Sequence, residues 1–558
     1  MKDEVKTLIK KLALLNAVKH DGKANPGAVV GGVIGDFPDL KKDMKSVMQE
    51  INSVVNDVNS LSIDSQKKEL LKIDSSALDK KEHIVDLFGF LNIKEGDKVR
   101  TAFPPGPEKY PHIGHAKAAI LNFMLAKKYG GEFYLRFEDT NPDLVKEEFY
   151  QIIQDDLKWV GVTWEKIIYA SDYMDLYYKH GEELIKKGDA YYCTCSQEET
   201  SKGRETGEPC KCRSISTQEN LKLWKDMPNQ EKGTATIRLK IDLKHKNSTM
   251  RDPALFRINH TIHARQKDKY SVWPTYDFQN AIMDGYLEIT HRIRSKEFEM
   301  RNELQRYLQT LLGYKETNIY EIGRFNLEGV ESSGRKIREK IESGELIGWD
   351  DPSITTIAAL RRRGFQPEAI REFVIKTGIT KNDVVLTWDD LIIHNKRLLD
   401  NKADRYFFVE NPVDVKVEGA PVKELNLNLH PTNKKGGRHL KTHEFFVITK
   451  EDFNNLEEGK IYRFMECFNV KYLAGSMFEY LDESIDTYKQ KGKGMMHFLP
   501  KNMDLIPISV MMPDKKIKKG LAEPGLNSLK EGEIVQFERF GFVRFDNKKD
   551  MIFWFTHK

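Results

Sequence analysis

The chain has 558 residues, enough for several domains, and its content of 39% hydrophobic and 31% charged residues is that of a globular protein. A formal net charge of +4 permits a nucleic-acid partner without indicating one. No apolar stretch approaches the length of a membrane span, and the charged start M-K-D-E-V-K lacks the apolar core of a signal peptide. These features argue against a membrane or secreted protein, and we expect a protein of the cytoplasm.

The first 95 residues are expected to form a separate helical domain. Residues 5–18 and 43–61 each place apolar side chains at the spacing of one helix face. The glycine-rich stretch 21–33 between them predicts a loop. The apolar positions are Leu8, Leu12, Leu15 and Val18 in the first segment and Met44, Val47, Ile51, Val54, Val55 and Val58 in the second. These residues alone predict a stabilising domain, because no catalytic pattern occurs among them.

The most informative stretch is F-P-P-G-P-E-K-Y-P-H-I-G-H at residues 103–115. It follows a run of β-forming residues at 98–103, which the prolines end. From residue 116 the apolar spacing becomes helical, and a second strand is expected at 132–137. The H-I-G-H sequence therefore opens the helix of a β-α-β unit, at the carboxyl end of the first strand, where open α/β sheets bind ligands.

The residue types in this stretch suit a phosphate. A helix start offers unpaired backbone N–H groups and the positive end of a dipole. Gly114 has no side chain, so a nucleotide can approach the backbone closely. His112 and His115 can donate hydrogen bonds to phosphate oxygens. The alternative is that both histidines merely cap an ordinary helix.

Further motifs follow in a fixed order: L-R-F-E-D-T-N-P at 135–142, W-P-T-Y-D-F at 273–278, I-T-H-R-I-R at 289–294 and G-W-D-D-P at 348–352. Together with the H-I-G-H stretch they resemble the class I aminoacyl-tRNA synthetases for glutamate and glutamine. The resemblance covers nearly the whole chain and is strongest to archaeal glutamyl enzymes.

The resemblance implies a multidomain architecture with an α/β Rossmann-like catalytic core. It divides the core into 96–190 and 269–330, separated by an insertion at 191–268 that grips the tRNA acceptor end. A helical stem-contact domain at 331–402 and an all-β barrel region at 403–558, which binds the anticodon, follow. The N-terminal domain at 1–95 would assist tRNA binding. Short aromatic and β-branched runs after residue 403 independently predict one or two β-barrels.

The glutamate site is assigned from the resemblance and from residue chemistry. Glu138 would hold the α-amino group, or else serve as a helix N-cap partner. Tyr276 and Asn280, four residues apart, would share a helix face and contact the substrate; a core position is the alternative for Tyr276. Arg294 would pair the γ-carboxylate with two bonds and so favour glutamate over glutamine. A salt bridge with Glu297 or Glu299 is the alternative role for Arg294.

Two departures from the family pattern affect the expected site. Relatives often carry Arg two positions before Pro-Pro, where this chain has Ala102, so Arg100 on the same strand face would replace it as a glutamate ligand. The second family signature, K-M-S-K-S, is replaced by S-S-G-R-K at 332–336. Its hydroxyls, hinge glycine and two cations suit a mobile loop around pyrophosphate, or else a solvated basic loop.

Four of the five cysteines are paired as Cys193-x-Cys195 and Cys210-x-Cys212. In a cytosolic chain this pattern indicates one structural Zn²⁺, with unmetallated thiols as the main alternative and disulfides as a lesser one. Bacterial glutamyl enzymes carry a comparable zinc knuckle, which supports the zinc prediction by resemblance.

The predicted function is glutamate–tRNA ligase, acting on L-glutamate, Mg²⁺-ATP and the tRNA for glutamate, with the tRNA for glutamine as a further possible substrate. Catalysis would combine positioning with charge stabilisation. The catalytic residues would be His112, His115, Arg335 and Lys336, with Pro105, Gly114, Ser332 and Ser333 also binding ATP. The alternatives are a glutaminyl-tRNA ligase and a nonenzymatic RNA-binding protein.

Overall fold

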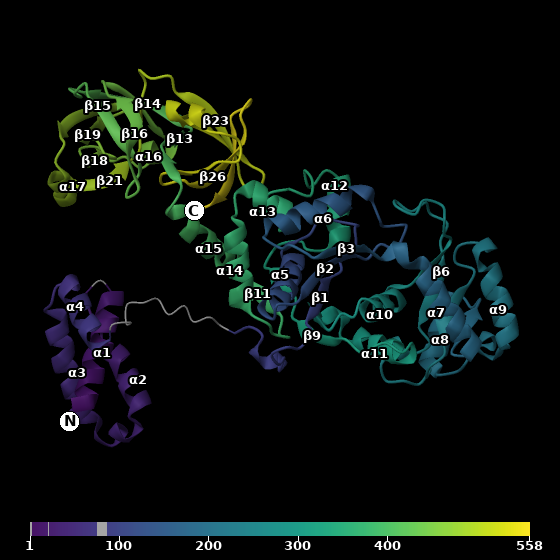
Figure 1. The fold of residues 1–558 in the computed structure, drawn as a ribbon. Coiled ribbons are helices and arrows are strands. Elements are labelled where there is room, and N and C mark those ends of the chain that lie inside the picture. Colours follow the sequence, from purple (N-terminus) through teal and green to yellow (C-terminus); the bar gives the residue numbers. More distant parts are fainter. Residues whose placement is uncertain (1–2, 21, 75–85) are drawn as a thin grey trace. The chain divides into compact units, whose positions relative to one another are not determined.

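The computed structural model describes residues 3–20, 22–74 and 86–558. The chain forms two compact units, residues 1–86 and 87–558 (Figure 1). No helix among the described residues is long and apolar enough to cross a membrane.

The N-terminal unit consists of α1 (Asp3–Lys19), α2 (Pro26–Asp36), a 3-10 helix (Pro38–Asp43), α3 (Met44–Asn59) and α4 (Ile63–Ile73). The predicted loop at 21–33 is therefore wrong beyond residue 25. The Asn25 side chain accepts from the backbone N–H of Gly27 at 2.8 Å and caps α2, and Pro26 suits its first turn. The glycines serve packing: a Cβ on Gly32 would lie 2.8 Å from Cδ1 of Leu12 in α1.

The buried face of α1 also differs from the prediction. Its buried residues are Val5, Ile9, Ala13, Leu14 and Ala17, whereas the four predicted positions are only partly buried. The reason is that α2, α3 and α4 all contact α1. Its apolar surface is therefore wide, and small residues lie on its innermost line.

The catalytic core is built on a parallel sheet. Strands β1 (Arg100–Phe103), β2 (Glu132–Phe137) and β3 (Lys166–Tyr169) pair in that order, and β8 (His291–Ser295) pairs with β9 (Asn318–Ile322). The backbone N–H of Thr290 donates to the carbonyl of Arg100 at 2.9 Å, so β8 continues the sheet beside β1. The spatial order β3-β2-β1-β8-β9 confirms the predicted Rossmann-like core, in which the strand order reverses between β1 and β8.

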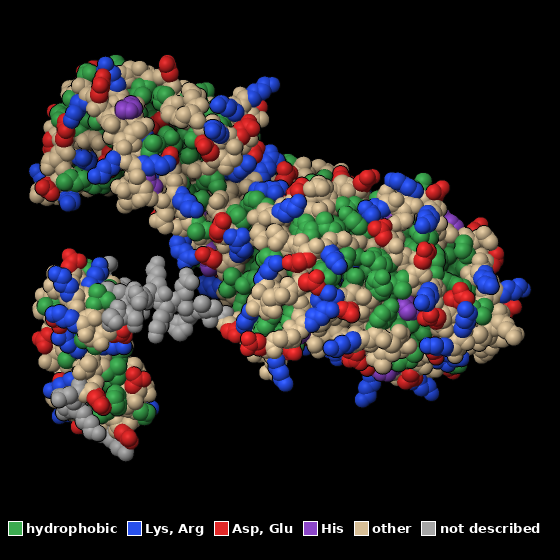
Figure 2. Space-filling model, in the orientation of Figure 1, with side chains coloured by type: hydrophobic (Ala, Val, Ile, Leu, Met, Phe, Trp, Pro, Cys, Tyr) green, Lys and Arg blue, Asp and Glu red, His purple; other side chains and the backbone are tan. Residues whose placement is uncertain are grey.

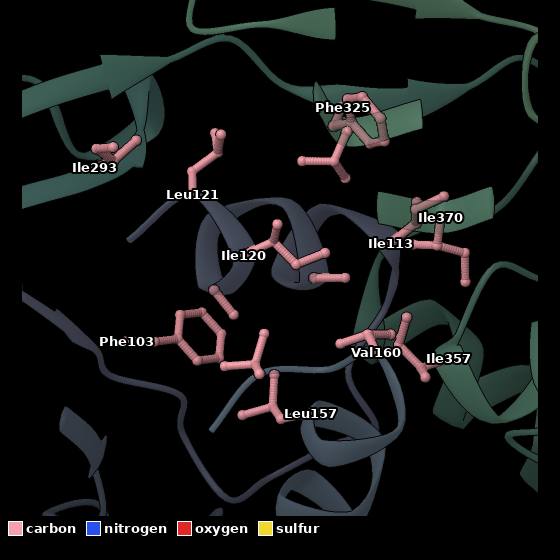
Figure 3. Close-up of a cluster of buried hydrophobic side chains, with 14 of the residues drawn as sticks. Phe103, Ile113, Ile120, Leu121, Leu157, Val160, Ile293, Phe325, Ile357 and Ile370 are labelled. Atoms are coloured by element: carbon pink, nitrogen blue, oxygen red, sulfur yellow. The ribbon is translucent and has the colours of Figure 1, made fainter. Parts of the chain in front are cut away.

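Helix α5 (Ile113–Lys128) is buried in the middle of this core. Figure 3 shows Ile113, Ile120 and Leu121 of α5 among apolar side chains from both halves of the core and from the helical segment after it, including Phe103, Ile293 and Ile357. Its polar Asn122 is fully buried. The Asn122 side chain donates to the carbonyl of Ile293 at 2.7 Å and accepts from its N–H at 3.0 Å. It thereby fastens β8 to α5.

The core also contains α6 (Glu147–Trp159), α7 (Met174–Lys187), α10 (Tyr276–Tyr286) and α11 (Arg301–Leu311). The insertion is a four-stranded antiparallel sheet in chain order with two helices. Its elements are β4 (Ala190–Cys193), α8 (Gln197–Thr206), α9 (Thr217–Asp226), β5 (Thr236–Leu239), β6 (Ala254–Ile258) and β7 (Val272–Pro274).

The segment after the core is not wholly helical. It contains α12 (Gly334–Glu342), α13 (Ile357–Arg363), α14 (Pro367–Thr377) and α15 (Trp388–Asp400). Between the last two helices, β11 (Val384–Leu386) pairs in parallel with β10 (Phe325–Leu327) and so joins this segment to the core.

The C-terminal region is all-β, as predicted, and contains two seven-stranded sheets (green to yellow in Figure 1). The first comprises β12 (Asp404–Tyr406), β13 (Phe408–Glu410), β23 (Ile506–Met511), β24 (Ile517–Ala522), β25 (Ile534–Phe537), β26 (Gly541–Asn547) and β27 (Ile552–His557). The second comprises β14 (Pro412–Glu418), β17 (Phe445–Thr449), β18 (Ile461–Phe464), β19 (Asn469–Ala474), β20 (Met477–Asp482), β21 (Gly492–Met496) and β22 (Leu499–Pro500). A hairpin of β15 (Glu424–His430) and β16 (Lys434–Lys441), and helices α16 (Lys450–Asn454) and α17 (Ile485–Lys491), complete the region.

The two sheets meet at residues 406–409. Tyr406 and Phe408 are buried in the core of the first sheet, and Phe407 and Val409 in that of the second. Side chains alternate along an extended backbone, so one short run supplies both cores.

Candidate active site

A cavity of about 1050 Å³ opens at the carboxyl ends of β1, β2 and β8. Most of the predicted site residues line it, although they come from segments up to 230 positions apart. They are Pro105, His112, Gly114, His115, Glu138, Tyr276, Arg294, Ser332, Ser333 and Arg335. Arg100, Asn280 and Lys336 are not among its lining residues.

Each of the two histidines caps α5 through its Nδ1 atom. Nδ1 of His112 accepts from the N–H of Gly114 at 3.0 Å, and Nδ1 of His115 accepts from the N–H of His112 at 3.3 Å. A neutral imidazole that accepts at Nδ1 carries its proton at Nε2. The structure confirms that both histidines cap the helix, and the Nε2–H that remains on each ring keeps capping compatible with the predicted phosphate contact.

Burial keeps both rings neutral. It lowers the pKa of His112 to about 3, with Lys109 adding to the shift, and it lowers the pKa of His115 well below its ordinary value, with His112 and Lys109 adding to that shift. At neutral pH each ring therefore offers the cavity a neutral N–H donor and no positive charge.

Two glycines permit close packing around the cavity. A Cβ on Gly114 would lie 2.8 Å from Cε1 of the His112 ring that caps its N–H. A Cβ on Gly334 would lie 2.5 Å from Cδ of Lys109. The second contact brings the loop before α12 against the loop before α5, so both border one cavity.

Glu138 is held by a buried charge network below the cavity. Its Oε1 accepts from Nε and Nη2 of Arg136 at 3.0 and 2.7 Å, and Arg136 Nη1 donates to Asp284 at 2.7 Å. Arg292 also donates to Asp284, at 2.7 Å. Burial would raise the pKa of Asp284, but Arg292 and Arg136 hold it below its ordinary value. Oε2 of Glu138 is buried and has no partner among the described residues.

Arg294 is a cavity cation that has no acidic partner in the described part of the chain. It is 5% exposed, and its Nε and Nη2 donate to Oδ1 of the uncharged Asn302. Its Nη1 is buried and has no partner within the described ranges. The alternative role in a salt bridge is wrong, because Glu297 pairs with Arg324 and Glu299 with Lys381.

Burial lowers the pKa of Arg294 to about 10, and the charge of Arg292 adds to this shift. Arg294 therefore remains charged at neutral pH. A buried guanidinium with a free N–H and only a neutral partner can accept a carboxylate as ligand.

The family comparisons agree with this geometry. Residues 98–401 match the model of the catalytic domain of class I tRNA synthetases (E and Q), and residues 403–479 and 486–546 match two models of their anti-codon binding domain. The chain belongs to this synthetase family. Glutamate–tRNA ligases from Pyrococcus abyssi and Methanocaldococcus jannaschii are 42% and 40% identical to it, each over 97% of their own length and over 97% and 96% of this chain. The ligase of Pyrococcus furiosus is 40% identical over the full length of both chains.

Three predicted residues lie elsewhere than expected of a synthetase substrate site. Arg100 is at the amino end of β1, where it bonds Glu132 and Glu288. The cavity is at the carboxyl end of the strand, so its position does not fit the prediction of a glutamate ligand. Asn280 is 2% exposed and bonds Arg136, Arg292 and Gln305, which makes it a support of the network. The side chain of Lys336 extends to Glu331 at 3.7 Å.

The loop that replaces K-M-S-K-S begins α12. Ser333 caps the helix by accepting from the N–H of Lys336, and the exposed Arg335 bonds Glu339 at 2.9 Å. Arg338, one turn further, also lines the cavity and donates to the carbonyl of Glu108 at 3.1 Å.

Sequence reasoning missed Arg292, Arg257, Gln279 and Arg338 among the cavity residues. A signal existed for Arg292, which lies two positions from Arg294 on β8 and therefore on the same face. Arg257 and Gln279 belong to β6 and α10, and no motif pointed to them.

The four paired cysteines lie together in the insertion. Their sulfur atoms are all within 4.8 Å of one another, and Cys195 and Cys212 are 3.9 Å apart. Four sulfurs at about 2.3 Å from a tetrahedral Zn²⁺ would be roughly 3.8 Å apart, so this cluster fits a structural zinc site. Cys467, the fifth cysteine, is buried in the second β core.

Proposed function

We propose that this chain is a glutamate–tRNA ligase, which activates L-glutamate with ATP and transfers it to tRNA. The observation that carries the choice of glutamate is Arg294, a buried cavity guanidinium with an uncharged partner and a free Nη1. A carboxylate ligand would satisfy it with charge-assisted bonds, whereas an amide would leave the charge poorly compensated. The archaeal relatives are named for the same activity.

Glutamate would lie between two unsatisfied groups. Oε2 of Glu138 offers a buried acceptor to the α-ammonium, and Nη1 of Arg294 offers a donor to the γ-carboxylate. Tyr276 adds a wall beside Arg294, since its ring packs on Phe298 at 5.5 Å and the Arg294 guanidinium lies 5.7 Å from the Phe298 ring centre. The α-carboxylate remains free to attack.

ATP would bind where α5 begins. Nε2–H groups of His112 and His115 would donate to phosphate oxygens, Gly114 and Pro105 would border the nucleotide, and Ser332, Ser333 and Arg335 would close over pyrophosphate. The glutamate α-carboxylate attacks the α-phosphorus, and the bond to pyrophosphate breaks. Mg²⁺, brought with ATP, would neutralise phosphate charge.

In the second step a hydroxyl of the terminal tRNA ribose attacks the carbonyl carbon of the adenylate. The new ester forms, AMP leaves with the electron pair, and the hydroxyl proton is released. We assign acceptor-end binding to the insertion, anticodon binding to residues 403–558, and a supporting role in tRNA binding to the N-terminal unit. A zinc ion on Cys193, Cys195, Cys210 and Cys212 would stabilise the insertion.

A glutaminyl-tRNA ligase would share most of these parts, but the uncharged side-chain amide of its substrate would leave the buried charge of Arg294 poorly compensated. A nonenzymatic RNA-binding protein would not require a buried acceptor at Glu138 Oε2 together with a buried donor at Arg294 Nη1 in one cavity. The test is aminoacylation of separate purified tRNAs for glutamate and glutamine, with each amino acid, alongside pyrophosphate exchange in the presence of tRNA. Charging by glutamate supports the proposal. Preferential charging by glutamine, or exchange with neither amino acid, overturns it.

A further inference from the structure

One wall of the cavity is not used by the residues proposed for ATP and glutamate. It includes Gln279 of α10 and Arg257 of β6. Gln279 is 1% exposed, yet neither its Oε1 nor its Nε2 has a partner among the described residues. Buried amides normally form hydrogen bonds, so an amide left unsatisfied beside a cavity indicates a ligand.

Arg257 is a second unsatisfied group on this wall. Its Nε is buried without a partner, and no carboxylate in the described part of the chain forms an ion pair with it. The nearby Asp143 attracts the Arg257 charge without forming an ion pair with it. The Asp143 carboxylate instead accepts from Lys232, Asn259 and Thr261. Burial lowers the pKa of Arg257. The wall therefore presents an uncompensated cation beside an uncharged amide.

Packing behind the wall positions these two residues. Phe256 and Phe278, which precede Arg257 and Gln279 in the sequence, pack with their ring centres 5.2 Å apart. In the insertion sheet, Arg257 is opposite Trp273, three residues before α10 begins. The wall is thus formed where the insertion joins the second half of the core.

The chemistry of this wall differs from that of the proposed glutamate site and ATP site. Glutamate presents an ammonium and two carboxylates, and ATP presents three phosphates at the helix start. The remaining reactant is the 3′ end of an RNA chain, which presents two ribose hydroxyls and one phosphodiester. An amide can both donate to and accept from hydroxyls, and a guanidinium suits a phosphate.

We propose that Gln279 and Arg257 form the subsite for the 3′-terminal nucleotide of tRNA, with Gln279 bonding its ribose hydroxyls and Arg257 its 5′-phosphate. The inference rests on the proposed function, because it assigns the third reactant of that ligation. Gln279 would orient the attacking hydroxyl, and Arg257 would fix the register of the strand.

The experiment compares Arg257→Gln, Arg257→Lys, Gln279→Leu and the control Arg238→Gln in the full-length protein. Arg238 is on the neighbouring strand β5 and is not among the lining residues. Its Nε is also buried without a hydrogen-bond partner among the described residues, and its other nitrogens donate to Asp252 and Thr200. Steady-state kcat/KM is measured for tRNA, with KM for glutamate and ATP. Binding is measured for intact tRNA and for tRNA lacking its last nucleotide, at several salt concentrations.

We expect Arg257→Gln to lower kcat/KM for tRNA about tenfold to a hundredfold, with KM for glutamate and ATP changed less than about twofold. Arg257→Lys should recover part of the loss. The slope of log K against log salt should become shallower by about 0.7, the value for one phosphate on a single strand. Gln279→Leu should lower kcat for charging without lowering the melting temperature, because the amide has no partner to lose.

The truncated tRNA gives the decisive comparison. Removing the last nucleotide should weaken tRNA binding to the native protein and to Arg238→Gln. It should reduce the affinity of Arg257→Gln much less, because this variant already lacks the contact with that nucleotide. An equal cost in all three proteins overturns the assignment of Arg257. A rise in KM for ATP or glutamate as large as the effect on tRNA assigns the wall to those substrates instead. If the native protein binds tRNA but does not charge it, the proposed function is wrong. The binding of truncated tRNA still tests the subsite in that case, because it does not depend on activity.

Discussion

The ring of Trp349 lies parallel to that of Tyr110, with ring centres 5.6 Å apart and 14° between the planes. Tyr110 is two residues before His112. Just after Trp349, the carbonyl of Thr355 accepts from the N–H of Ile113 at 3.0 Å, and Ile357 donates to the carbonyl of Pro111 at 2.8 Å. Trp349 of the G-W-D-D-P motif and the segment after that motif therefore brace the loop that presents both histidines.

Loss of this brace should weaken ATP use. We expect Trp349→Ala to raise KM for ATP or lower the rate of adenylate formation by about two- to tenfold, the range for one aromatic pair, and Trp349→Phe to preserve most activity. The matched control is Trp388→Ala, since Trp388 packs on Phe365 and is not a lining residue of the cavity. Equal kinetic losses in both alanine variants would refute the brace.

Removing one histidine should affect the reaction more than the fold. His115→Ala deletes an Nε2–H donor and one cap contact, so adenylate formation should fall about tenfold to a thousandfold while stability falls by about 1 kcal/mol. Because the pKa of each histidine is below its ordinary range, the native rate should show no histidine titration between pH 6 and 8.

His180→Ala serves as control, since His180 bonds Glu183 and Tyr314 and is not among the cavity residues. That variant should lose stability and keep its rate per folded molecule. A similar loss of adenylate formation in both variants would show that the effect of His115 is structural.

The cysteine cluster should hold one zinc ion per chain. Elemental analysis of the native protein should find it, and a double Cys193/Cys195→Ser variant should lose both the metal and thermal stability, because metal binding contributes to folding. Cys467→Ser, which changes the lone buried cysteine, should keep its zinc. A native protein that is free of metal yet has full stability and activity would exclude the site.

The buried Asp156 should make stability fall as the pH rises. Burial raises its pKa to about 7, with Arg361 at 3.2 Å opposing the shift, and both carboxylate oxygens lack hydrogen bonds among the described residues. Its pKa is about 3.9 in the unfolded chain, so between pH 4 and 7 the folded state binds the extra proton. Stability contributed by this proton is lost as the pH rises through 7.

Asp156→Asn should therefore raise the melting temperature relative to the native protein more at pH 8 than at pH 5. The control is Asp155→Asn, because Asp155 is its exposed neighbour on α6. A difference that does not depend on pH would mean that Asp156 is ionised throughout.

The local parts of the site could be predicted from the sequence because each depends on adjacent residues. β-forming residues, prolines and a helical apolar pattern place His112 and His115 at the start of α5, and β2 has the predicted bounds. The role of capping was also available, since histidine can accept from the N–H groups of a helix start.

The rest could not be predicted because it joins distant segments. Arg136, Asp284 and Arg292 come from β2, α10 and β8, and only the folded sheet shows that two arginines share one aspartate. Arg100 was misplaced for a related reason: strand alternation gives the face of a residue, but the position along the strand decides whether it reaches the cavity. The interleaved C-terminal sheets likewise depend on pairing of β13 with β24, over a hundred residues later.

Arg294 should set the choice of glutamate over glutamine. Arg294→Ser removes the buried cation that has only Asn302 as partner, so the γ-carboxylate would enter a pocket without its donor. We expect kcat/KM for glutamate to fall about 30- to 1000-fold, or roughly 2–4 kcal/mol, and that for glutamine to fall far less or to rise.

Arg324→Gln is the matched control, because Arg324 also lines the cavity but already pairs with Glu297 at 2.5 Å. The measurement is kcat/KM for both amino acids with the same tRNA in all three proteins. Equal losses for glutamate and glutamine in Arg294→Ser would mean that Arg294 holds the α-carboxylate, ATP or the fold. The selectivity would then have to come from other groups facing the cavity, of which Arg292 is the nearest candidate on the same strand face.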